Sequence, residues 1–432
     1  MGFLASITNR VKKSNLARGF IITTLGSGIS KVILVAATFV CSNLLGKAEF
    51  GELSFVRNTL NMVLCICALN FTTLCTKFTT EAKDSLISIH RLFLLFLFSV
   101  GVCIVIGFLL IVLPDTIMIR VFSTSTVVSF FRITGLFLPL FIMQPLIEGV
   151  FRGLKSFNTI SILQITSSLF YLIAIVIGIR VNGLTGALTS VILYYLLYSL
   201  ICIVVLEHKT SFLNKRSLIR GFTLQGAVVR TMILPIFLMS FIDAPIMWIA
   251  QVVLSKAGNM ESIGSMTAML QLRNLAMLIP GYFINTFVAF AGEMNSAKQY
   301  TEYYSKFSRI EGIYLAIGLI VFILFSVLSK PLLSLYGRDF VVDWPAMIVS
   351  NIGIPLSLLI SLYRVDLVLK EHQRFLLYIS VAWNIVWIAS LFIMLKLGVN
   401  PLISFFASQN IGALVFVLSL HRIYSTDKRT LL

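Results

Sequence analysis

Long apolar runs, divided by short breaks that carry charge or contain Gly, Pro or Asn, make up most of the chain. A bilayer core about 30 Å thick is crossed by about 20 mostly apolar residues in a helix. Twelve runs are long enough, and they predict an all-α integral membrane protein with twelve transmembrane helices. The six in the first half cover residues 19–45, 51–76, 90–113, 126–151, 157–179 and 184–206. The six in the second half cover residues 221–254, 263–291, 311–329, 344–368, 375–397 and 401–423.

The composition agrees with a bilayer as the main solvent. Apolar residues make up 58% of the 432 residues and charged residues 12%, whereas soluble domains average about 45–50% and about 25%. The first run follows a basic segment but continues to Leu45, which is too long for the apolar core of a signal peptide, so we expect an uncleaved helix. The twelve runs leave little chain for a separate soluble domain.

The two halves of the chain resemble each other. Gly51 and Gly264 lie 213 residues apart, whereas Phe151 and Tyr363, each followed by Arg, lie 212 apart at the ends of the fourth and tenth helices. Because six helices per repeat give both halves the same orientation, we predict a parallel pseudo-repeat of two six-helix lobes around a central cleft. The predicted lobes are residues 1–206 and 221–432, joined by a cytoplasmic linker at residues 207–220.

Lys and Arg in the loops predict the orientation. With the N-terminus inside the cell, the cytoplasmic tails and loops hold 22 of the 34 basic residues, and the outer loops hold seven. Since basic residues are retained on the cytoplasmic side, both termini are predicted to be cytoplasmic. Basic residues beside anionic headgroups also explain most of the net charge of +17, and no soluble basic domain is left to bind nucleic acid.

Five basic residues fall inside the predicted helices. They are Lys31, Arg57, Arg132, Arg230 and Arg273. Each would cost roughly 2.5–3.5 kcal/mol at the bilayer centre, so we expect these side chains to face a wet cavity or a partner. Acidic partners inside the helices are too few to neutralise all five. The excess indicates a basic internal cavity, and the five residues are the candidate substrate-binding residues.

Snorkelling is the alternative for a basic residue near a helix end, because its long side chain can reach the headgroups. This alternative fits Arg132, which lies about six residues inside its predicted helix, better than it fits Lys31 or Arg273. The acidic candidates are Asp243 in the seventh helix and Glu148 near the inner end of the fourth. Each is either the structural partner of a basic residue or a site that senses a coupling ion.

The sequence contains no motif for catalysis, for ATP hydrolysis or for a cofactor. It lacks a GxxxxGK phosphate loop, an HExxH zinc motif and a GxSxG nucleophile elbow. Its six cysteines lie in or beside apolar runs and do not have the pairing of a disulfide or zinc site. We therefore expect a transporter and not an enzyme, with no cofactor and no metal.

Two segments resemble a known family. They are Leu44-Leu45-Gly46-Lys47-Ala48-Glu49-Phe50-Gly51, between the first two helices, and Phe151-Arg152-Gly153 with Lys155, after the fourth. Together with the twelve-helix layout they are similar to the polysaccharide transporter family, which includes the O-antigen flippases of Gram-negative bacteria. Its superfamily also holds multidrug extruders and the peptidoglycan lipid flippase. The resemblance covers the whole chain in layout, and the first segment has the character of a motif.

The resemblance implies a bacterial inner-membrane protein of O-antigen, lipopolysaccharide or related polysaccharide biosynthesis. Such a protein moves an undecaprenyl-pyrophosphate-linked oligosaccharide from the cytoplasmic to the periplasmic leaflet by alternating access. The expected partners are this glycolipid, membrane lipids, a proton or sodium ion, and the polysaccharide polymerase machinery. A diphosphate fits the interior basic residues, because arginine donates bidentately to phosphate and Lys31 would act as a point charge.

Two other functions are weighed against the flippase. A cation-coupled multidrug exporter of the same fold would need an acidic cavity, for which the sequence offers mainly Asp243. An integral-membrane glycan polymerase, an enzyme that acts on the same lipid, would need a long periplasmic loop. The longest outer loop, between about Lys330 and Trp344, is too short for that role.

Overall fold

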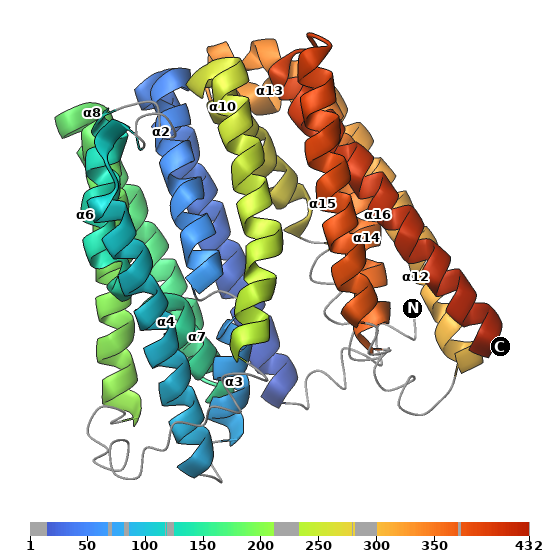
Figure 1. Cartoon of the computed structure of the whole chain (residues 1–432), viewed down its shortest axis with the longest axis horizontal. Coiled ribbons are helices and arrows are strands. Elements are labelled where there is room, and N and C mark those ends of the chain that lie inside the picture. The colour runs from blue at the N-terminus through green and yellow to red at the C-terminus, as the bar shows by residue number, and fades with distance from the viewer. Residues whose placement is uncertain are drawn as a thin grey trace. The chain divides into compact units, whose positions relative to one another are not determined.

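The fold is helical. The computed structural model describes residues 15–67, 71–81, 86–116, 118, 125–210, 233–278, 280, 300–369 and 373–431. Within these ranges the chain forms helices joined by short turns, and it forms no strand (Figure 1). The all-α prediction is confirmed.

The first half of the described chain contributes six labelled helices (Figure 1). These are α2 (Asn15–Cys67), α3 (Thr72–Glu81), α4 (Leu86–Val112), α6 (Ser125–Phe141), α7 (Met143–Gly153) and α8 (Phe157–Thr210). The second half contributes α10 (Leu234–Ala276), α12 (Tyr300–Val327), α13 (Ser329–Ser334), the 3-10 helix η4 (Arg338–Asp343), α14 (Trp344–Leu369), α15 (Gln373–Lys396) and α16 (Pro401–Leu431).

Three of these helices are double, because a residue with non-helical backbone angles divides them. The kinks lie at Gly46 in α2, at Asn182 and Gly183 in α8, and at Asn259 in α10. With each side of a kink counted separately, and with α3 and α7 taken as the inner parts of the second and fourth spans, the described helices account for the twelve predicted crossings.

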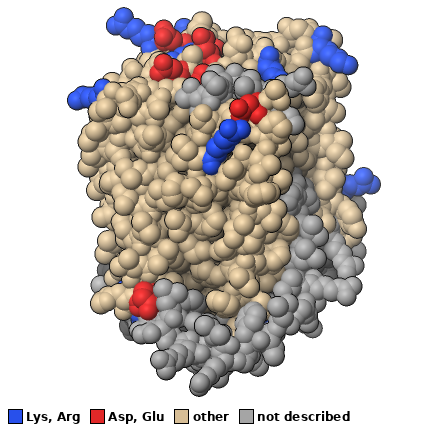
Figure 2. Space-filling model, turned by 60° about the vertical axis from the view of Figure 1, so that its left-hand side comes forward, with Lys and Arg blue, Asp and Glu red and all other residues tan. Residues whose placement is uncertain are grey.

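The outward-facing surface of the helices is apolar. The stretch His90–Val112 has a mean hydropathy of 3.0, yet only 22% of it is buried inside the protein. On the face shown in Figure 2, most charged side chains gather toward one end, and a broad region below them is uncharged. Apolar patches of this extent are not stable against water, so the surface is suited to lipid.

The chain divides into two compact units. Unit 1 comprises Met1–Cys41 and Val56–Ala244, and unit 2 comprises Ser42–Phe55 and Pro245–Leu432. In unit 1, α4 packs against α6, and α8 packs against α6 and α7. In unit 2, α14 and α15 pack against α16, and α12 packs against α14. The middle of α2 thus belongs to unit 2, whereas its two ends belong to unit 1.

The kinks in α2 and α10 are equivalent in position and in conformation. Gly46 and Asn259 lie 213 residues apart. Gly46 has φ 77° and ψ 173°, and Asn259 has φ 63° and ψ 179°. These angles fall in a region that L-residues other than glycine rarely adopt, so the shared conformation marks the same turn in both halves.

The segments that follow these two kinks approach each other closely in unit 2. A Cβ on Gly51 would collide with the carbonyl oxygen of Met260, and a Cβ on Gly264 would lie 2.6 Å from the carbonyl oxygen of Lys47. Lys47 and Met260 are also 213 residues apart, so the two contacts exchange under the repeat. We name this pair of contacts the kink crossing. Its reciprocity is that of a local two-fold axis, as a parallel pseudo-repeat requires.

Candidate substrate-binding site

Arg57 lies in unit 1, where tyrosine rings surround it. Its guanidinium carbon lies 5.6 Å from the ring centroid of Tyr171 on α8, which is a cation–π arrangement. The ring of Tyr194 packs on those of Tyr171 and Tyr195, with centroids 5.0 Å and 5.1 Å apart. Among the residues that the structure describes, Arg57 has no carboxylate partner. Its charge is therefore available to an anion.

Glu148, on α7, is the centre of a polar network in unit 1. Its residue is 8% exposed, and its carboxylate accepts hydrogen bonds from the Tyr198 hydroxyl at 2.6 Å and from the Gln164 amide at 3.2 Å. Arg152 lies 3.8 Å away, which is a long ion pair. Ser27 on α2 donates to the Gln164 side-chain oxygen at 2.7 Å. The predicted acidic residue is thus bonded mainly to neutral groups.

Lys31 lies one helical turn after Ser27 on α2, so both residues lie on the side of the helix that faces Gln164. The lysine is exposed, and within the described ranges it has no acidic partner. Its position beside the polar network of unit 1 keeps it a candidate for contact with an anion.

Arg132 differs from the other candidates because it is paired. Its guanidinium lies 2.6 Å from the Asp115 carboxylate, and the two side chains are 42% and 58% exposed. An exposed, neutralised arginine fits the snorkelling alternative better than the cavity interpretation. We therefore leave Arg132 out of the site proposed below.

Arg273 lies in unit 2, on α10, among amide and backbone groups. One guanidinium nitrogen donates to the Gln409 side-chain oxygen at 3.0 Å and to the Ser350 carbonyl oxygen at 3.5 Å. A Cβ on Gly353 would lie 2.7 Å from the same nitrogen, so this glycine makes room for the guanidinium. No acidic side chain in the described part of the chain pairs with Arg273.

Two predicted site residues lie wholly or partly outside the described residues. Arg230 falls within residues 211–232, which the structure does not describe. Asp243 lies in α10, and only its backbone is described. Their roles in substrate binding and in coupling stay predictions.

The sequence reasoning missed the neutral partners of the buried arginines. Tyr171, Tyr194 and Tyr195 were grouped with lipid-facing or packed aromatic residues, and Gln409 was not considered. A cluster of three tyrosines at 194, 195 and 198, and adjacent amides at Gln409 and Asn410 inside an apolar run, were the available signals. Polar groups inside a membrane helix need partners, so such clusters indicate a polar interior.

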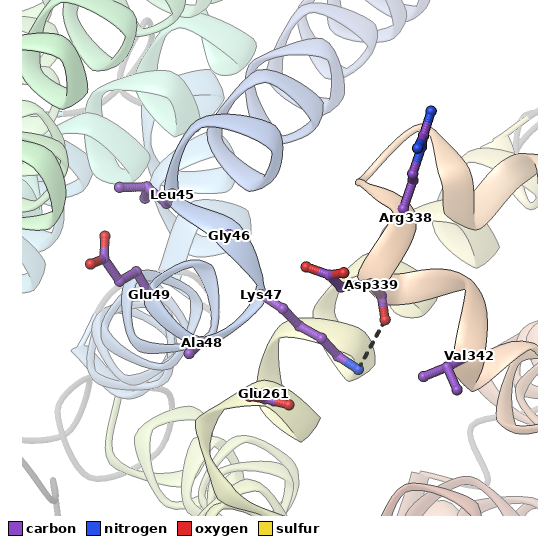
Figure 3. Close-up of a pocket in the computed structure, with 9 residues that line it drawn as sticks. All are labelled: Leu45, Gly46, Lys47, Ala48, Glu49, Glu261, Arg338, Asp339 and Val342. Carbon is purple, nitrogen blue, oxygen red and sulfur yellow. Dashed lines mark hydrogen bonds between the residues drawn. The ribbon is translucent and has the colours of Figure 1, made fainter.

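Unit 2 also has an open pocket of about 710 Å³ beside the kink of α2. Its charged lining residues are Lys47, Glu49, Glu261, Arg338 and Asp339 (Figure 3). Figure 3 shows the lysine pointing to the Asp339 carbonyl oxygen, at 3.4 Å. With two basic and three acidic side chains, the pocket does not have the basic character expected of a diphosphate site.

The lysine of this pocket is held by an ion pair. Its Nζ lies 2.6 Å from the Asp343 carboxylate, and the two side chains are 12% and 20% exposed. Ser265 on α10 donates to the same carboxylate at 2.5 Å. These contacts tie the turn of the family-like segment to η4 and α10, within unit 2. Among the described residues, no group of three or more His, Cys, Asp or Glu side chains could hold a metal ion.

Comparisons with solved structures show the fold. An inward-facing multidrug resistance MATE family transporter of the MOP superfamily is similar with a TM-score of 0.77 and 14% identity, over 95% of this chain and 98% of that chain. An outward-facing MATE transporter is similar at 0.67 and 12%, over 96% of each chain. A MOP superfamily transporter from Pyrococcus furiosus, described as having a binding pocket of reverse polarity, is similar at 0.63 and 12%, over 98% of each.

The comparison with protein families identifies this chain. No curated protein sequence matches it. Residues 16–249, more than half of the chain, match the family described as polysaccharide biosynthesis protein. The predicted twelve-helix membrane fold and the predicted family are confirmed. The chain belongs to the polysaccharide biosynthesis protein family and has the fold of the MOP superfamily transporters.

Proposed function

We propose that this protein is a flippase that moves an undecaprenyl-pyrophosphate-linked oligosaccharide from the cytoplasmic to the periplasmic leaflet of the bacterial inner membrane by alternating access. The family membership supports a role in polysaccharide biosynthesis, and the fold supports transport. The O-antigen repeat unit, or the repeat unit of a related surface polysaccharide, is the proposed substrate.

The observation that carries the proposal is the pair of interior arginines without a carboxylate. Arg57 and Arg273 are held by tyrosine rings and by amide oxygens, so their positive charge is not neutralised within the described residues. An anion that must cross hydrocarbon needs such charges, because leaving water without a partner is prohibitively unfavourable. A diphosphate bound to the forked guanidinium groups satisfies both sides.

Deletion of the gene tests the substrate. The null strain should lose its surface glycan and accumulate the lipid-linked oligosaccharide in the inner leaflet, where enzymes supplied from the cytoplasmic side can reach it. Expression of the wild-type chain should restore display. Accumulation of no lipid-linked glycan, with normal surface polysaccharide, would contradict the proposal.

A cation-coupled multidrug exporter is the second candidate. The buried carboxylate of Glu148 and the fold shared with MATE transporters favour it. Vesicles that contain the purified protein separate the two functions. A flippase should move a short-chain polyprenyl-diphosphate saccharide and leave a fluorescent cationic dye in place, whereas an exporter should do the reverse. A proton or a sodium ion is the proposed coupling ion, with Asp243 and Glu148 as candidate sites.

The orientation is proposed from the loop charges. Reporter fusions after Lys83, after Lys215 and at the C-terminus should report cytoplasm, and fusions after Lys47 and Arg338 should report periplasm, because Lys and Arg are retained inside. A periplasmic C-terminus would overturn the orientation without affecting the fold.

A further inference from the structure

Three carboxylates in the described helices accept a hydrogen bond from a tyrosine hydroxyl. The pairs are Tyr198 with Glu148 at 2.6 Å, Tyr303 with Asp366 at 2.5 Å, and Tyr363 with Glu311 at 2.5 Å. Of these described pairs, the last is the one whose hydroxyl also contacts a histidine. It joins α12, α14 and α16 within unit 2.

The geometry around Tyr363 fixes where hydrogens must lie. Its hydroxyl oxygen is 2.5 Å from Glu311 Oε1 and 2.6 Å from His421 Nδ1. A tyrosine has one hydroxyl hydrogen, which can serve only one of these acceptors. When that hydrogen is donated to the carboxylate, the second short contact requires a hydrogen on Nδ1 of the imidazole. The arrangement therefore selects a histidine with a protonated Nδ1.

The same three groups form a path from the surface to a partly buried carboxylate. The His421 side chain is 54% exposed, the Glu311 side chain is 24% exposed, and Tyr363 is buried at 2%. Nδ1 of the histidine lies 3.7 Å from Glu311 Oε1. A proton can therefore reach the imidazole from water, and the positive charge then lies beside a carboxylate.

The surroundings leave Glu311 as the carboxylate that faces His421. Asp366, on α14, is buried and accepts its hydrogen bond from Tyr303 on α12. Arg364, also on α14, lies over the Phe416 ring at 5.2 Å. The other titratable side chains in the packed cluster are Tyr304 on α12 and Tyr424 on α16, and α15 contributes the apolar Leu376, Ile379 and Trp383. Arg309 and Arg422 are exposed.

We propose that Glu311, Tyr363 and His421 form a proton-binding site in unit 2. Uptake of one proton converts neutral His421 into an imidazolium that is paired with Glu311 and hydrogen-bonded to Tyr363. Release of that proton restores a neutral ring and leaves the carboxylate unpaired. Histidine is the side chain that ordinarily changes charge between about pH 5 and pH 8. As the coupling site of transport, this role rests on the proposed function; as a proton site, it does not.

A double-mutant cycle at two pH values tests proton binding without any substrate. The unfolded chain lacks the carboxylate partner, so the charged pair adds stability at low pH, and this stability is lost as the pH rises. In the purified full chain, Glu311→Gln and His421→Gln should be non-additive by about 2 °C in Tm at about pH 5.5. At about pH 8.5 the two changes should be additive. Additivity at both values, or equal coupling at both, would overturn the site.

Two controls keep this test specific. Glu302→Gln removes an exposed carboxylate of the same helix, which pairs with Lys306, and it should show no coupling with His421→Gln. Tyr363→Phe keeps the buried ring and removes the hydroxyl, so it should weaken the coupling at low pH. It also provides a second variant if either glutamine variant does not fold.

Transport in vesicles tests the use of the site. With a short-chain polyprenyl-diphosphate saccharide as the probe, a pH gradient should accelerate the wild type, whereas Glu311→Gln and His421→Gln should move it at least about fivefold more slowly and ignore the gradient. Binding of the probe should be retained. If the wild type moves no probe but the cycle stays pH-dependent, the flippase function fails and the proton site stands. If both variants respond to the gradient as the wild type does, the coupling role fails and the flippase function stands.

Discussion

The two halves of the chain are alike at the kink crossing and different around their interior arginines. At the crossing, Gly51 meets Met260 as Gly264 meets Lys47, and both contacts follow the same offset. In the interior, Arg57 faces a tyrosine ring in unit 1, whereas Arg273 donates to an amide oxygen in unit 2. One repeat therefore has two kinds of basic site.

The difference shows which constraint acts where. At the kink crossing two backbones are in contact, so any side chain larger than hydrogen would force them apart, and both halves are held to glycine. Around a buried arginine, tyrosine rings and amide oxygens are both adequate neutral partners. The substrate proposed here is not symmetrical, since a diphosphate lies between a lipid and a sugar, and unequal sites suit it.

The largest expected effect is at the kink crossing. Gly51→Leu and Gly264→Leu should each destabilise the protein by at least about 3 kcal/mol, because a side chain would overlap a carbonyl oxygen of the facing helix. Thermal unfolding in detergent and the amount of folded protein in membranes measure the loss. Gly101→Leu is the matched control, since no atom lies within 4 Å of a Cβ there. Unequal effects of the two glycine changes would break the symmetry inferred for the crossing.

The next effect is on transport and not on folding. Arg57→Ala and Arg273→Ala should each lower surface glycan display at least about tenfold, the equivalent of about 1.4 kcal/mol, because each removes a charge proposed to meet the diphosphate. Complementation of the null strain, with protein amount in the membrane measured in parallel, checks this. Arg132→Ala, which breaks an exposed ion pair with Asp115, should change display less than about twofold. Normal display by both interior variants would refute the substrate-binding role.

Lysine substitutions separate the two kinds of site. Arg57→Lys should keep most of its transport, because an ammonium group over the Tyr171 ring retains the cation–π interaction. Arg273→Lys should remain several-fold impaired, because a point charge cannot reproduce a planar fork beside Gln409 and the Ser350 carbonyl oxygen. The same complementation assay measures both variants. Equal rescue at both positions would show that charge alone matters and that the surroundings do not.

The smallest effect concerns the two kinks. Asn259 holds a conformation that suits glycine, as Gly46 does at the equivalent position. Asn259→Gly should therefore stabilise the protein by about 1 kcal/mol, and Gly46→Asn should destabilise it by a similar amount. Thermal unfolding should show shifts of a few degrees in opposite directions. A loss of stability in Asn259→Gly would mean that the asparagine side chain makes a contact that outweighs the backbone strain.

The sequence by itself determined the membrane fold, the repeat and the presence of charge inside the helices. Apolar runs of spanning length have few stable alternatives to helices in a bilayer, so helix number could be derived without tertiary information. The offset between Gly51 and Gly264 was visible as well, because glycine at a backbone contact tolerates no substitute. Interior Lys and Arg were evident from their position in apolar runs. Arg230 and Asp243 were found in the same way, and their roles are still predictions.

Only the tertiary structure decided which groups meet. Tyr171 reaches Arg57 from another helix, Gln409 reaches Arg273 from α16, and Glu148 bonds to Tyr198 and not to an interior arginine. Hydropathy counts tyrosine with the apolar residues, so a sequence profile hides its hydroxyl as a partner for carboxylates. The contact of Glu311, Tyr363 and His421 joins three helices, and its existence depends on how these helices are rotated against one another. Rotation is set by packing between helices, which the order of residues along one helix does not specify.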